Sequence, residues 1–366
     1  MPLLVAFTLC VLSHSLGFVH CALSCKGENG KDVDWYLMYK IPKMKKNPLN
    51  FMQPNGGEYA YIDSASKSTS FWSFSDYDIY SKNNPIANTV APLTAKKMPK
   101  RMMYLVYNDQ PPPPYNKTRD GHTKGVVMYD GYSVVWLQHS VPQFLRGLHK
   151  GKYIYPDNGR ENGQVLMCVT FPGKEIEVIA KQLLIGRPFV YDHYGSDPWQ
   201  EKFPYLKRLL ANDYRKNKSK DLFAIDKLHS KGGASLVAIS KSPKLHIDIY
   251  TELVSKYLTD TLHVESWRNG NGNPLVSTCK GNYKIIDVDT VRLQFSMSKS
   301  IEFSYREDHS KWAVSDTKLF FCISSLNRME SQFSRGGGVL CIKNASLAKL
   351  FRKSIKDSIP CQKKKV

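Results

Sequence analysis

Two strand-like runs flank an Asp-Gly dipeptide at residues 130–131, within the stretch HTKGVVMYDGYSVVWLQHS. Asp-Gly between runs of β-branched and aromatic residues is one of the strongest short-range signals of a β-hairpin, and it favours a two-residue type I′ turn. Counting outward from such a turn sets His122 opposite His139. It also sets Lys124 opposite Leu137. Because side chains two apart on a strand share a face, His122, Lys124 and His139 are expected to project from one face of the hairpin.

A second stretch, DHSKWAVSD at residues 308–316, repeats this outline, because His-x-Lys again leads into a strand-like run and LFFCIS returns after it. A four-residue turn at 315–318 would place His309 opposite Ser324. Ser324 would then play the part that His139 plays in the first hairpin. We interpret the two stretches as a faint internal duplication, in which one imidazole from each half meets the other at a pseudo-twofold axis and makes a single site.

The His-x-Lys spacing alone is weak, because a chain with 10 His and 52 Lys and Arg contains a few such triplets by chance. A third triplet occurs at His229 and Lys231, where two glycines follow, and we interpret His229 as a turn residue. A bulge at Gly125 could also shift the register of the first hairpin. The other histidines interpreted as structural are His193, His246 and His263.

Charge and the amino-terminal segment are typical of an exported basic protein. Lys and Arg exceed Asp and Glu by 52 to 32, and the net charge of +20 favours a polyanionic partner such as nucleic acid over the alternative of a merely solvated basic surface. Residues 1–24 have the apolar run and small terminal residues of a signal peptide, although no basic residue precedes them. No later segment has the roughly 18 apolar residues of a membrane span.

Cysteines and glycosylation sequons agree with the secretory pathway. Cleavage after residue 24 removes Cys10 and Cys21, and the six remaining cysteines would form three disulfides with about 15 possible pairings. Asn-x-Ser/Thr sequons, which are glycosylation sites in exported proteins, occur at Asn116, Asn217 and Asn344.

The chain is expected to divide into two halves of similar design. Residues 25–195 carry the first His-x-Lys motif, residues 205–361 carry the second, and a basic tail follows at 362–366. The seam is placed at 194–204. Within the first half, KEIEVIAKQLLIG has the apolar spacing of a helix that ends near Gly186.

Competing cofactor motifs are absent from the sequence or ambiguous. There is no HExxH, no paired CxxC and no GxxxxGK[ST], so no metal or nucleotide cofactor is predicted. Asp287 and Asp289 could pair on a strand face to hold magnesium, but the alternating Ile and Val around them favour an ordinary half-exposed strand. Trp35 and Trp312 could stack on bases or pack in the core.

Five motifs, VDWYLMYKIP, GHTKGVV, QHSVPQF, DHSKWAVSD and RGGGVLC, occur in the order found in the deoxyribonuclease II family, and this resemblance spans nearly the whole mature chain. It implies an α+β, phospholipase D-like fold with two pseudo-symmetric halves, each with a central mixed β-sheet flanked by helices. In the phospholipase D superfamily, which this family resembles, the repeated motif is His-x-Lys-x4-Asp. The second copy here is complete with His309, Lys311 and Asp316. The first copy departs from it, with Tyr129 at the Asp position and Asp130 one residue later.

The resemblance also implies the disulfides and the reaction. Matching cysteines would pair as Cys25–Cys168, Cys279–Cys361 and Cys322–Cys341. The family's products have 3′-phosphate and 5′-hydroxyl ends, so the 5′ oxygen leaves. The secretory leader and basic charge fit both lysosomal members and venom members such as the plancitoxins, and the motifs do not separate the two.

The predicted chemistry is metal-independent hydrolysis of double-stranded DNA. Lys124 and Lys311 would screen the phosphate oxygens, as a metal does in many nucleases. One imidazole would attack phosphorus to form a phosphohistidine, while the other, protonated, would protonate the leaving oxygen and then activate water. We predict His122 as the nucleophile and His309 as the acid, with His139, Ser324 and Asp316 in support.

Two further functions are consistent with the sequence. One is a nuclease-derived basic toxin or DNA-binding protein that needs no turnover, which the intact His-x-Lys pairs argue against. The other is a lipid phosphodiesterase, for which no membrane-binding helix is evident. Oligomeric state, whether monomer or homodimer, does not follow from the sequence.

Overall fold

The computed structural model has an α+β architecture, which confirms the predicted class. The predicted leader up to residue 21, the sequon at Asn217 and the tail at 362–366 lie outside the described residues. The residues that the structure describes are 22–44, 53–66, 70–99, 101–195, 197–213, 221–270 and 272–361.

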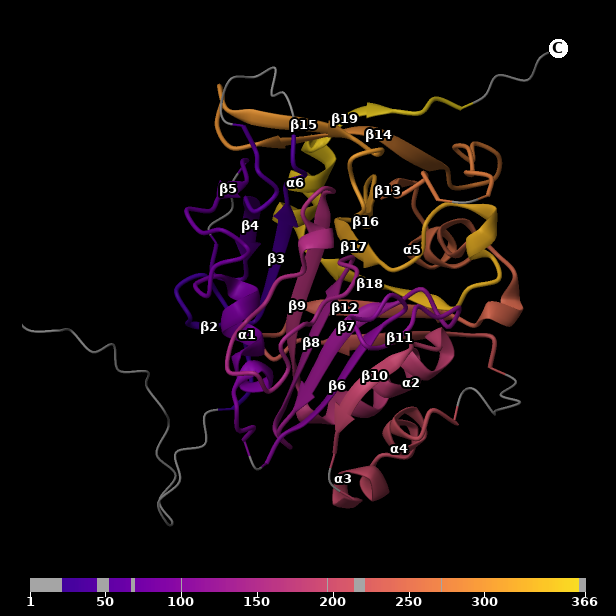
Figure 1. The fold of residues 1–366 in the computed structure, drawn as a ribbon. Coiled ribbons are helices and arrows are strands. Elements are labelled where there is room, and N and C mark those ends of the chain that lie inside the picture. The colour runs from indigo at the N-terminus through magenta and orange to yellow at the C-terminus, as the bar shows by residue number, and fades with distance from the viewer. Residues whose placement is uncertain are drawn as a thin grey trace, which may run out of the picture.

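The first large sheet is built from strands between residues 35 and 194, and its neighbouring strands are all antiparallel (Figure 1). Its order is β10-β6-β7-β8-β9-β3-β4-β5. It is therefore antiparallel where a mixed sheet was predicted. The strands are β3 (Trp35–Lys40), β4 (Tyr59–Asp63), β5 (Ser73–Phe74), β6 (Met103–Asn108), β7 (Lys124–Tyr129), β8 (Ser133–His139), β9 (Gln164–Pro172) and β10 (Val190–Tyr194).

The second large sheet lies between residues 223 and 358 and is mixed, because β13 and β14 are parallel. Its order is β11-β12-β18-β17-β16-β13-β14-β15, and β19 also pairs with β14. A two-stranded ribbon of β1 (Cys25–Lys26) and β2 (Asp32–Val33) stands apart. The strands are β11 (Phe223–His229), β12 (Ser235–Lys241), β13 (Leu262–Ser266), β14 (Ile285–Gln294), β15 (Ser300–Ser304), β16 (Lys311–Ser315), β17 (Phe320–Ser324), β18 (Gly337–Lys343) and β19 (Ile355–Ser358).

The helices are short, and the predicted one at 174–186 is confirmed as α2, whose C-cap is Arg187 in the left-handed region. Helix α3 begins in the predicted seam at 194–204. The α-helices are α1 (Pro85–Thr94), α2 (Ile176–Gly186), α3 (Asp197–Lys202), α4 (Pro204–Leu210), α5 (Ser255–Leu258) and α6 (Ala345–Lys353). A π-helix (Tyr250–Val254) precedes α5, and 3-10 turns occur at Asp157–Gly159, Gly173–Glu175, Pro243–Leu245 and Glu330–Gln332.

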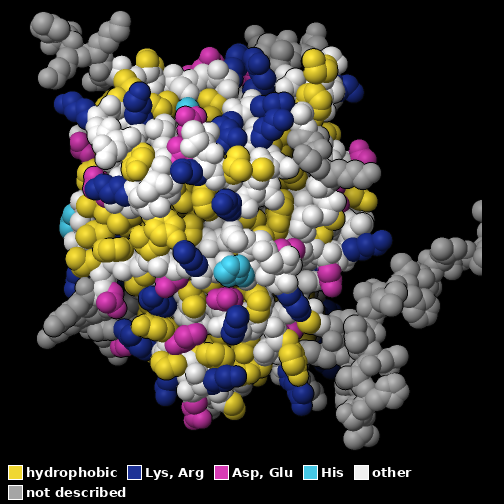
Figure 2. Space-filling view, turned by 180° about the vertical axis from the view of Figure 1, so that it is seen from behind, with side chains coloured by type: hydrophobic (Ala, Val, Ile, Leu, Met, Phe, Trp, Pro, Cys, Tyr) yellow, Lys and Arg dark blue, Asp and Glu magenta, His cyan; other side chains and the backbone are white. Residues whose placement is uncertain are grey.

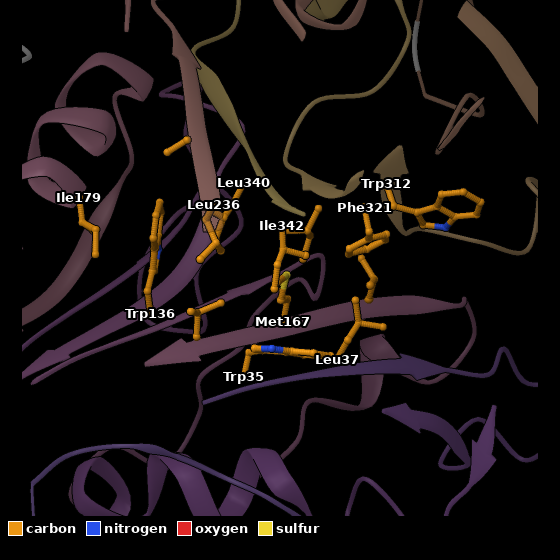
Figure 3. Packing of buried hydrophobic residues seen from close by; sticks show 14 of the residues in the cluster. Trp35, Leu37, Trp136, Met167, Ile179, Leu236, Trp312, Phe321, Leu340 and Ile342 are labelled. Atoms are coloured by element: carbon orange, nitrogen blue, oxygen red, sulfur yellow. The ribbon is translucent and has the colours of Figure 1, made fainter. Parts of the chain in front are cut away.

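The main hydrophobic core lies between the two sheets (Figure 3). Leu37 on β3 and Met167 on β9 face Phe321 and Ile342 of the second sheet, while the alternate residues of β3 and β9 pack on the side of α1. Burial on both faces explains why these strands are almost wholly apolar. Trp35 and Trp312 are both buried in this core, so they are core residues and not base-stacking platforms.

The first predicted hairpin forms, but its turn lies one residue later than expected. Tyr129 pairs with Val134, so the turn is centred on residues 131–132. Pairing continues through Gly125 without a bulge. Glycine fits this position because a Cβ there would meet the Tyr107 hydroxyl at 2.3 Å. The register therefore moves by two residues relative to the prediction, and the position opposite His139 is Lys124 instead of His122.

Side-chain chemistry at Asp130 explains the displaced turn. Its Oδ1 accepts hydrogen bonds from the backbone N–H groups of Tyr132 (2.9 Å) and Ser133 (2.8 Å). Gly131 has φ of 93°, as the first central residue of a type II′ turn requires. Asp130 is thus the residue that precedes the turn, and Gly131 occupies its first central position.

The second hairpin is displaced in the same way. Val314 pairs with Phe321, so the four-residue turn spans 316–319 instead of 315–318. The Ser315 hydroxyl accepts the N–H of Phe320 at 2.8 Å and holds this register. The position opposite Ser324 is therefore Lys311. Because both registers move by two residues, the correspondence of Ser324 with His139 is retained, with a lysine as the cross-strand partner of each.

Three disulfides are present, Cys25–Cys168, Cys279–Cys361 and Cys322–Cys341, and they are the pairs that the family resemblance implies. The first ties the ribbon at the amino terminus to β9, and the other two lie within the second half. Among the described residues, no helix is both long and apolar enough to cross a membrane.

Candidate active site

His309 lies directly before β16 and reaches the opposite half of the molecule. Its Nδ1 is 3.0 Å from the carbonyl oxygen of Ser140 and 3.4 Å from Oε1 of Gln164. Both atoms are acceptors, since Gln164 Oε1 already accepts the Ser140 hydroxyl at 2.5 Å. The proton of neutral His309 therefore resides on Nδ1, and Nε2 carries the lone pair. Its side chain is half-buried, and the Trp267 ring lies edge-on to it at 5.3 Å.

His122 lies two residues before β7 and is more deeply buried than His309. Its Nε2 is 3.9 Å from Oδ2 of Asp109, and its Nδ1 has no hydrogen-bond partner among the described residues. Asp109 is itself buried and ion-paired with Lys124 and, at 3.2 Å, with Arg335. An imidazole beside a carboxylate is the better placed of the two histidines to hold a second proton.

The two histidines are held by matching backbone contacts that cross between the halves. The N–H of His309 donates to the carbonyl of Gly163 at 2.9 Å, and the N–H of His122 donates to the carbonyl of Gly336 at 2.8 Å. Each glycine is the residue directly before a strand of the other half, β9 or β18. Each half thus supplies one imidazole and one receiving carbonyl, as a pseudo-twofold arrangement requires.

The two predicted lysines are buried at the same site. Lys124 is ion-paired with Asp109, and Nζ of Lys311 donates to the carbonyl of His309 at 2.6 Å. Burial and the charge of Lys124 lower the pKa of Lys311 well below its usual value. Burial followed by Lys311 and Lys124 likewise lowers the pKa of His309. These mutual effects show that both halves contribute to one electrostatic unit.

The same electrostatics act on His122 and Asp109. Burial lowers the pKa of His122 well below its usual value, although Asp109 opposes this shift. Burial would raise the pKa of Asp109, but Lys124, His122 and Arg335 outweigh it and hold that pKa low. The Asp109 carboxylate is thus held among basic groups, and the basic groups around it favour the binding of a further negative charge.

His139 and Ser324 occupy matching places beside the lysines. Nδ1 of His139 accepts the N–H of Val141 at 3.2 Å, so the ring proton is on Nε2, which has no partner among the described residues. Burial, then Lys124, lowers the pKa of His139 to about 3. It is therefore a neutral donor. The Ser324 hydroxyl accepts the N–H of Leu326 at 3.3 Å.

The family model for deoxyribonuclease II matches residues 24–361. The chain belongs to the deoxyribonuclease II family. It is 34% identical to mouse (Mus musculus) deoxyribonuclease-2-alpha over 343 residues, which cover 93% of this chain and 94% of the relative. It is 34% identical over 346 residues to plancitoxin-1 of Acanthaster planci, with 93% of each chain covered. It is 32% identical over 359 residues to deoxyribonuclease-2 of Caenorhabditis elegans, with 91% of this chain and 92% of the relative covered.

Membership of the deoxyribonuclease II family confirms the predicted family and enzyme class, a nuclease of the hydrolase type. The α+β architecture with two sheets fits the phospholipase D-like fold that the resemblance implied.

The structure does not bring Asp316 to the candidate site of the two histidines and two lysines. Asp316 follows the far end of β16, five residues from Lys311, which corresponds to about 16 Å along a strand. Its carboxylate is half-exposed and lies 3.4 Å from Nε2 of His263. The acidic residues beside the two lysines are instead Asp109 and Asp308, which a linear His-x-Lys-x4-Asp pattern does not indicate.

Other residues at the site are also absent from the sequence-based prediction. Asp109 directly precedes the stretch QPPPP at residues 110–114. Arg335 belongs to the RGGGVLC motif, which was the only sequence signal for it. Gln164 and Trp267 stand in ordinary strand-like and loop-like contexts and carried no signal. His229 is exposed at the end of β11, as expected for a turn-side residue.

The alternative magnesium pair does not form. Asp287 is buried, and its Oδ1 is ion-paired with Nε of Arg328 at 2.7 Å. This ion pair explains why a carboxylate is buried on this strand. Asp289, two residues further along, is only half-buried. In the part of the chain that the structure describes, no group of three or more His, Cys, Asp or Glu side chains is arranged to hold a metal ion.

Glu265 on β13 is a buried acid next to this site whose removal should stabilise the protein. Both carboxylate oxygens lack a hydrogen-bond partner among the described residues, and burial followed by Asp308 raises its pKa well above the usual value. A carboxyl with a raised folded-state pKa lowers stability as pH rises above its unfolded pKa, near 4.5. Glu265→Gln should therefore raise Tm by about 1–3 °C at pH 7 and leave it nearly unchanged at pH 4. Thermal melts at both pH values test this, and a lower Tm at pH 7 would contradict it.

Proposed function

We propose that this chain is a metal-independent endonuclease that hydrolyses double-stranded DNA to 3′-phosphate and 5′-hydroxyl ends through a phosphohistidine intermediate. The observation that supports this most directly is the meeting of two imidazoles and two ammonium groups from different halves. The Nδ1 of His309 contacts Ser140 of the other half. Burial, then Lys311, Lys124 and His122, lower the pKa of His309, and the last two belong to the other half. Membership of the deoxyribonuclease II family supports DNA as the substrate.

His309 is the nucleophile in this proposal. Because the Ser140 carbonyl holds a proton on Nδ1, Nε2 offers its lone pair to the phosphorus. A phosphorus–nitrogen bond forms as the bond from phosphorus to the 5′ oxygen breaks. The sequence-based prediction assigned the opposite roles. The half-buried position of His309 and the carboxylate beside His122 support this exchange.

His122 is the general acid, and afterwards the general base. Asp109, 3.9 Å from Nε2, favours the protonated imidazole, which gives its proton to the leaving 5′ oxygen. Neutral His122 then takes a proton from water as the water oxygen attacks phosphorus. The phosphorus–nitrogen bond breaks, and the 3′-phosphate and free His309 are released. Lys124 and Lys311 neutralise the nonbridging oxygens, and the neutral Nε2–H of His139 donates to one of them.

Activity should rise as pH falls from 7 to 5. Burial and neighbouring cations lower the pKa values of His122 and Lys311, so the free enzyme lacks protons that the phosphate complex needs. Each proton taken up on binding the phosphate increases kcat/KM by up to about tenfold per pH unit below neutrality. Steady-state cleavage of plasmid at constant ionic strength measures this profile. Activity that increases towards pH 8 would contradict the assignment of a protonated acid.

Plasmid nicking should continue at an unchanged rate in EDTA, because the lysines supply the positive charge at the phosphate. The control is an unrelated magnesium-dependent nuclease in the same buffer, which should stop. Loss of activity in EDTA that magnesium restores would overturn the metal-independent reaction.

Cleavage products should carry 3′-phosphate and 5′-hydroxyl ends. Polynucleotide kinase should label the 5′ ends without prior phosphatase treatment, whereas a DNA polymerase should extend the 3′ ends only after phosphatase treatment. Direct extension of untreated products would show 3′-hydroxyl ends and contradict the proposal.

Export through the secretory pathway, to the lysosome or outside the cell, is part of the same proposal. Three disulfides and an exposed sequon at Asn116 support it. Figure 2 shows Lys and Arg side chains spread over one face of the molecule, with a denser group near its upper edge. Such a distribution supports contacts with many phosphates of one DNA molecule. A toxin role without turnover remains the alternative, and the plasmid assay separates the two.

A further inference from the structure

Two lysines outside the proposed reaction are buried at corresponding places in the two halves. Lys40 is the last residue of β3, and Lys241 is the last residue of β12. Both side chains are 0% exposed. Lys40 pairs across the sheet with Gln164, the first residue of β9, and Lys241 pairs with Gly337, the first residue of β18. They therefore stand beside the two segments that receive the histidines.

Each ammonium group holds backbone carbonyls of the adjacent segment. Nζ of Lys40 donates to the carbonyl of Arg160 at 2.7 Å. Nζ of Lys241 donates to the carbonyls of Phe333 at 2.8 Å and Arg335 at 2.7 Å. Arg160 lies three residues before Gly163, and Phe333 lies three residues before Gly336. The two contacts thus occupy the same place in each half.

We propose that Lys40 and Lys241 are positioning residues that fix the receiving loops at 160–163 and 333–336, so that each lysine orients the catalytic histidine of the opposite half. Lys40 acts on His309 through Gly163, and Lys241 acts on His122 through Gly336. The inference rests on the proposed function, because it assumes that these two histidines perform the reaction.

The receiving loops approach closely enough for small displacements to matter. A Cβ on Gly163 would lie 2.6 Å from Oδ1 of Asp308, and a Cβ on Gly336 would lie 2.4 Å from the carbonyl oxygen of Gly186. The backbone of each loop is therefore packed directly against its neighbour. A lost carbonyl contact would move the glycine carbonyl and, with it, the imidazole that it holds.

Packing alone does not explain an ammonium group at these positions. A buried charge costs free energy that an aliphatic side chain of the same length would avoid. An aliphatic side chain, however, cannot donate to carbonyls. The carbonyl contacts are thus the feature that distinguishes lysine from methionine at these positions.

The charges around the two lysines make this arrangement sensitive to pH. Burial lowers the pKa of Lys40 to about 7, against the opposing effects of Asp308, Glu58 and Glu161, while Arg160 lowers it further. Burial lowers the pKa of Lys241 to about 8, against Asp248. Each ammonium donates charge-assisted hydrogen bonds below its pKa and weaker neutral ones above it. The loops are therefore held most firmly in acid.

The variants Lys40→Met and Lys241→Met test the crossed connection between lysine and histidine. Each should reduce kcat at saturating DNA by about 10–100-fold, because an imidazole misplaced by about 1 Å loses most of its catalytic effect. KM should stay within about twofold. In ¹⁵N-histidine NMR spectra of the resting protein, Lys40→Met should shift the ring signals of His309, and Lys241→Met those of His122. Lys181→Met removes the ion pair between Lys181 on α2 and Asp226 on β11; it is the matched control and should change neither kcat nor the histidine signals.

Several outcomes would overturn the proposal. Unchanged kcat in both folded variants, or equal shifts of both histidine signals in each, would do so. If the parent protein is fully active in EDTA and the variants give either of these results, the proposed function is retained and this inference alone is refuted.

A measurement on the parent protein covers the case in which the methionine variants do not fold. The amides of His122 and His309 should lose about tenfold of their hydrogen-exchange protection between pH 6 and 9, after correction for intrinsic exchange. The amide of Val127, in the centre of β7, should lose none. Constant protection of all three amides would refute the proposal.

Discussion

Replacing His309 by asparagine is expected to reduce the turnover of DNA cleavage by more than about 10⁴-fold, because a nucleophile contributes more than the 10²–10⁴ typical of acid–base catalysis. The fold should persist, since the asparagine amide can still donate to the Ser140 carbonyl that His309 contacts at 3.0 Å. DNA affinity should change little, because it depends on many phosphate contacts of a chain with net charge +20. Initial plasmid nicking rates, with near-ultraviolet circular dichroism for folding, measure the effect.

A substrate with a better leaving group separates the roles of the two histidines. A 5′-bridging phosphorothiolate linkage expels a thiolate, which needs no general acid. The cleavage rate of His122→Asn should therefore be about 10²-fold or more higher on this linkage than on normal DNA. The cleavage rate of His309→Asn should be no higher on this linkage than on normal DNA. Recovery of His309→Asn alone would restore the sequence-based assignment, with His122 as nucleophile.

The exposed His229 supplies the control for these variants. It begins the third His-x-Lys triplet and lies at the end of β11. His229→Asn should cut within a few-fold of the parent rate. A folded His309→Asn protein that cuts DNA at the parent rate would refute the proposed two-histidine reaction.

Replacing Lys311 by methionine should lower kcat by about 10²–10³-fold, the effect of removing one preorganised charge from a transition state. Its ammonium is buried and donates at 2.6 Å to the His309 carbonyl, so it lies beside the residue that we propose as the nucleophile. Burial and Lys124 lower its pKa, so the charge costs stability in the absence of DNA. The variant should consequently be at least as stable as the parent, which separates a catalytic loss from unfolding.

Lys124→Met should have a similar effect on turnover but the opposite effect on stability. Lys124 is ion-paired with Asp109, which is buried, and losing one partner leaves that carboxylate poorly compensated. Lys231→Met, in the third triplet, should leave turnover within a few-fold of the parent rate. Nicking rates and Tm of the three variants test this contrast, and equal stability changes in Lys311→Met and Lys124→Met would contradict it.

The two hairpins show how far local pattern reaches. Alternation of side chains predicted the strands of both hairpins, and the Asp-Gly dipeptide added a turn signal for the first one only. Each turn was predicted one residue too early, because a side chain fixes it in the folded protein. Asp130 accepts two backbone N–H groups in the first hairpin, and the Ser315 hydroxyl accepts the N–H of Phe320 in the second. A two-residue change of register preserves the face of every strand side chain, so Lys124 and His139 still project from the same face.

Local sequence was sufficient to predict the strands of the two hairpins, the two His-x-Lys pairs and, through ordered motifs, the deoxyribonuclease II family, since these depend on neighbours along the chain. The groups around the histidines, by contrast, come from distant parts of the chain and depend on how the two sheets pack. The Ser140 carbonyl lies 169 residues from His309, and Arg335 lies 226 residues from Asp109. Such contacts form because two sheets pack face to face and bring distant loops together, and no local spacing encodes that packing. For the same reason the linear motif indicated Asp316, whereas the folded protein places Asp109 and Asp308 beside the lysines.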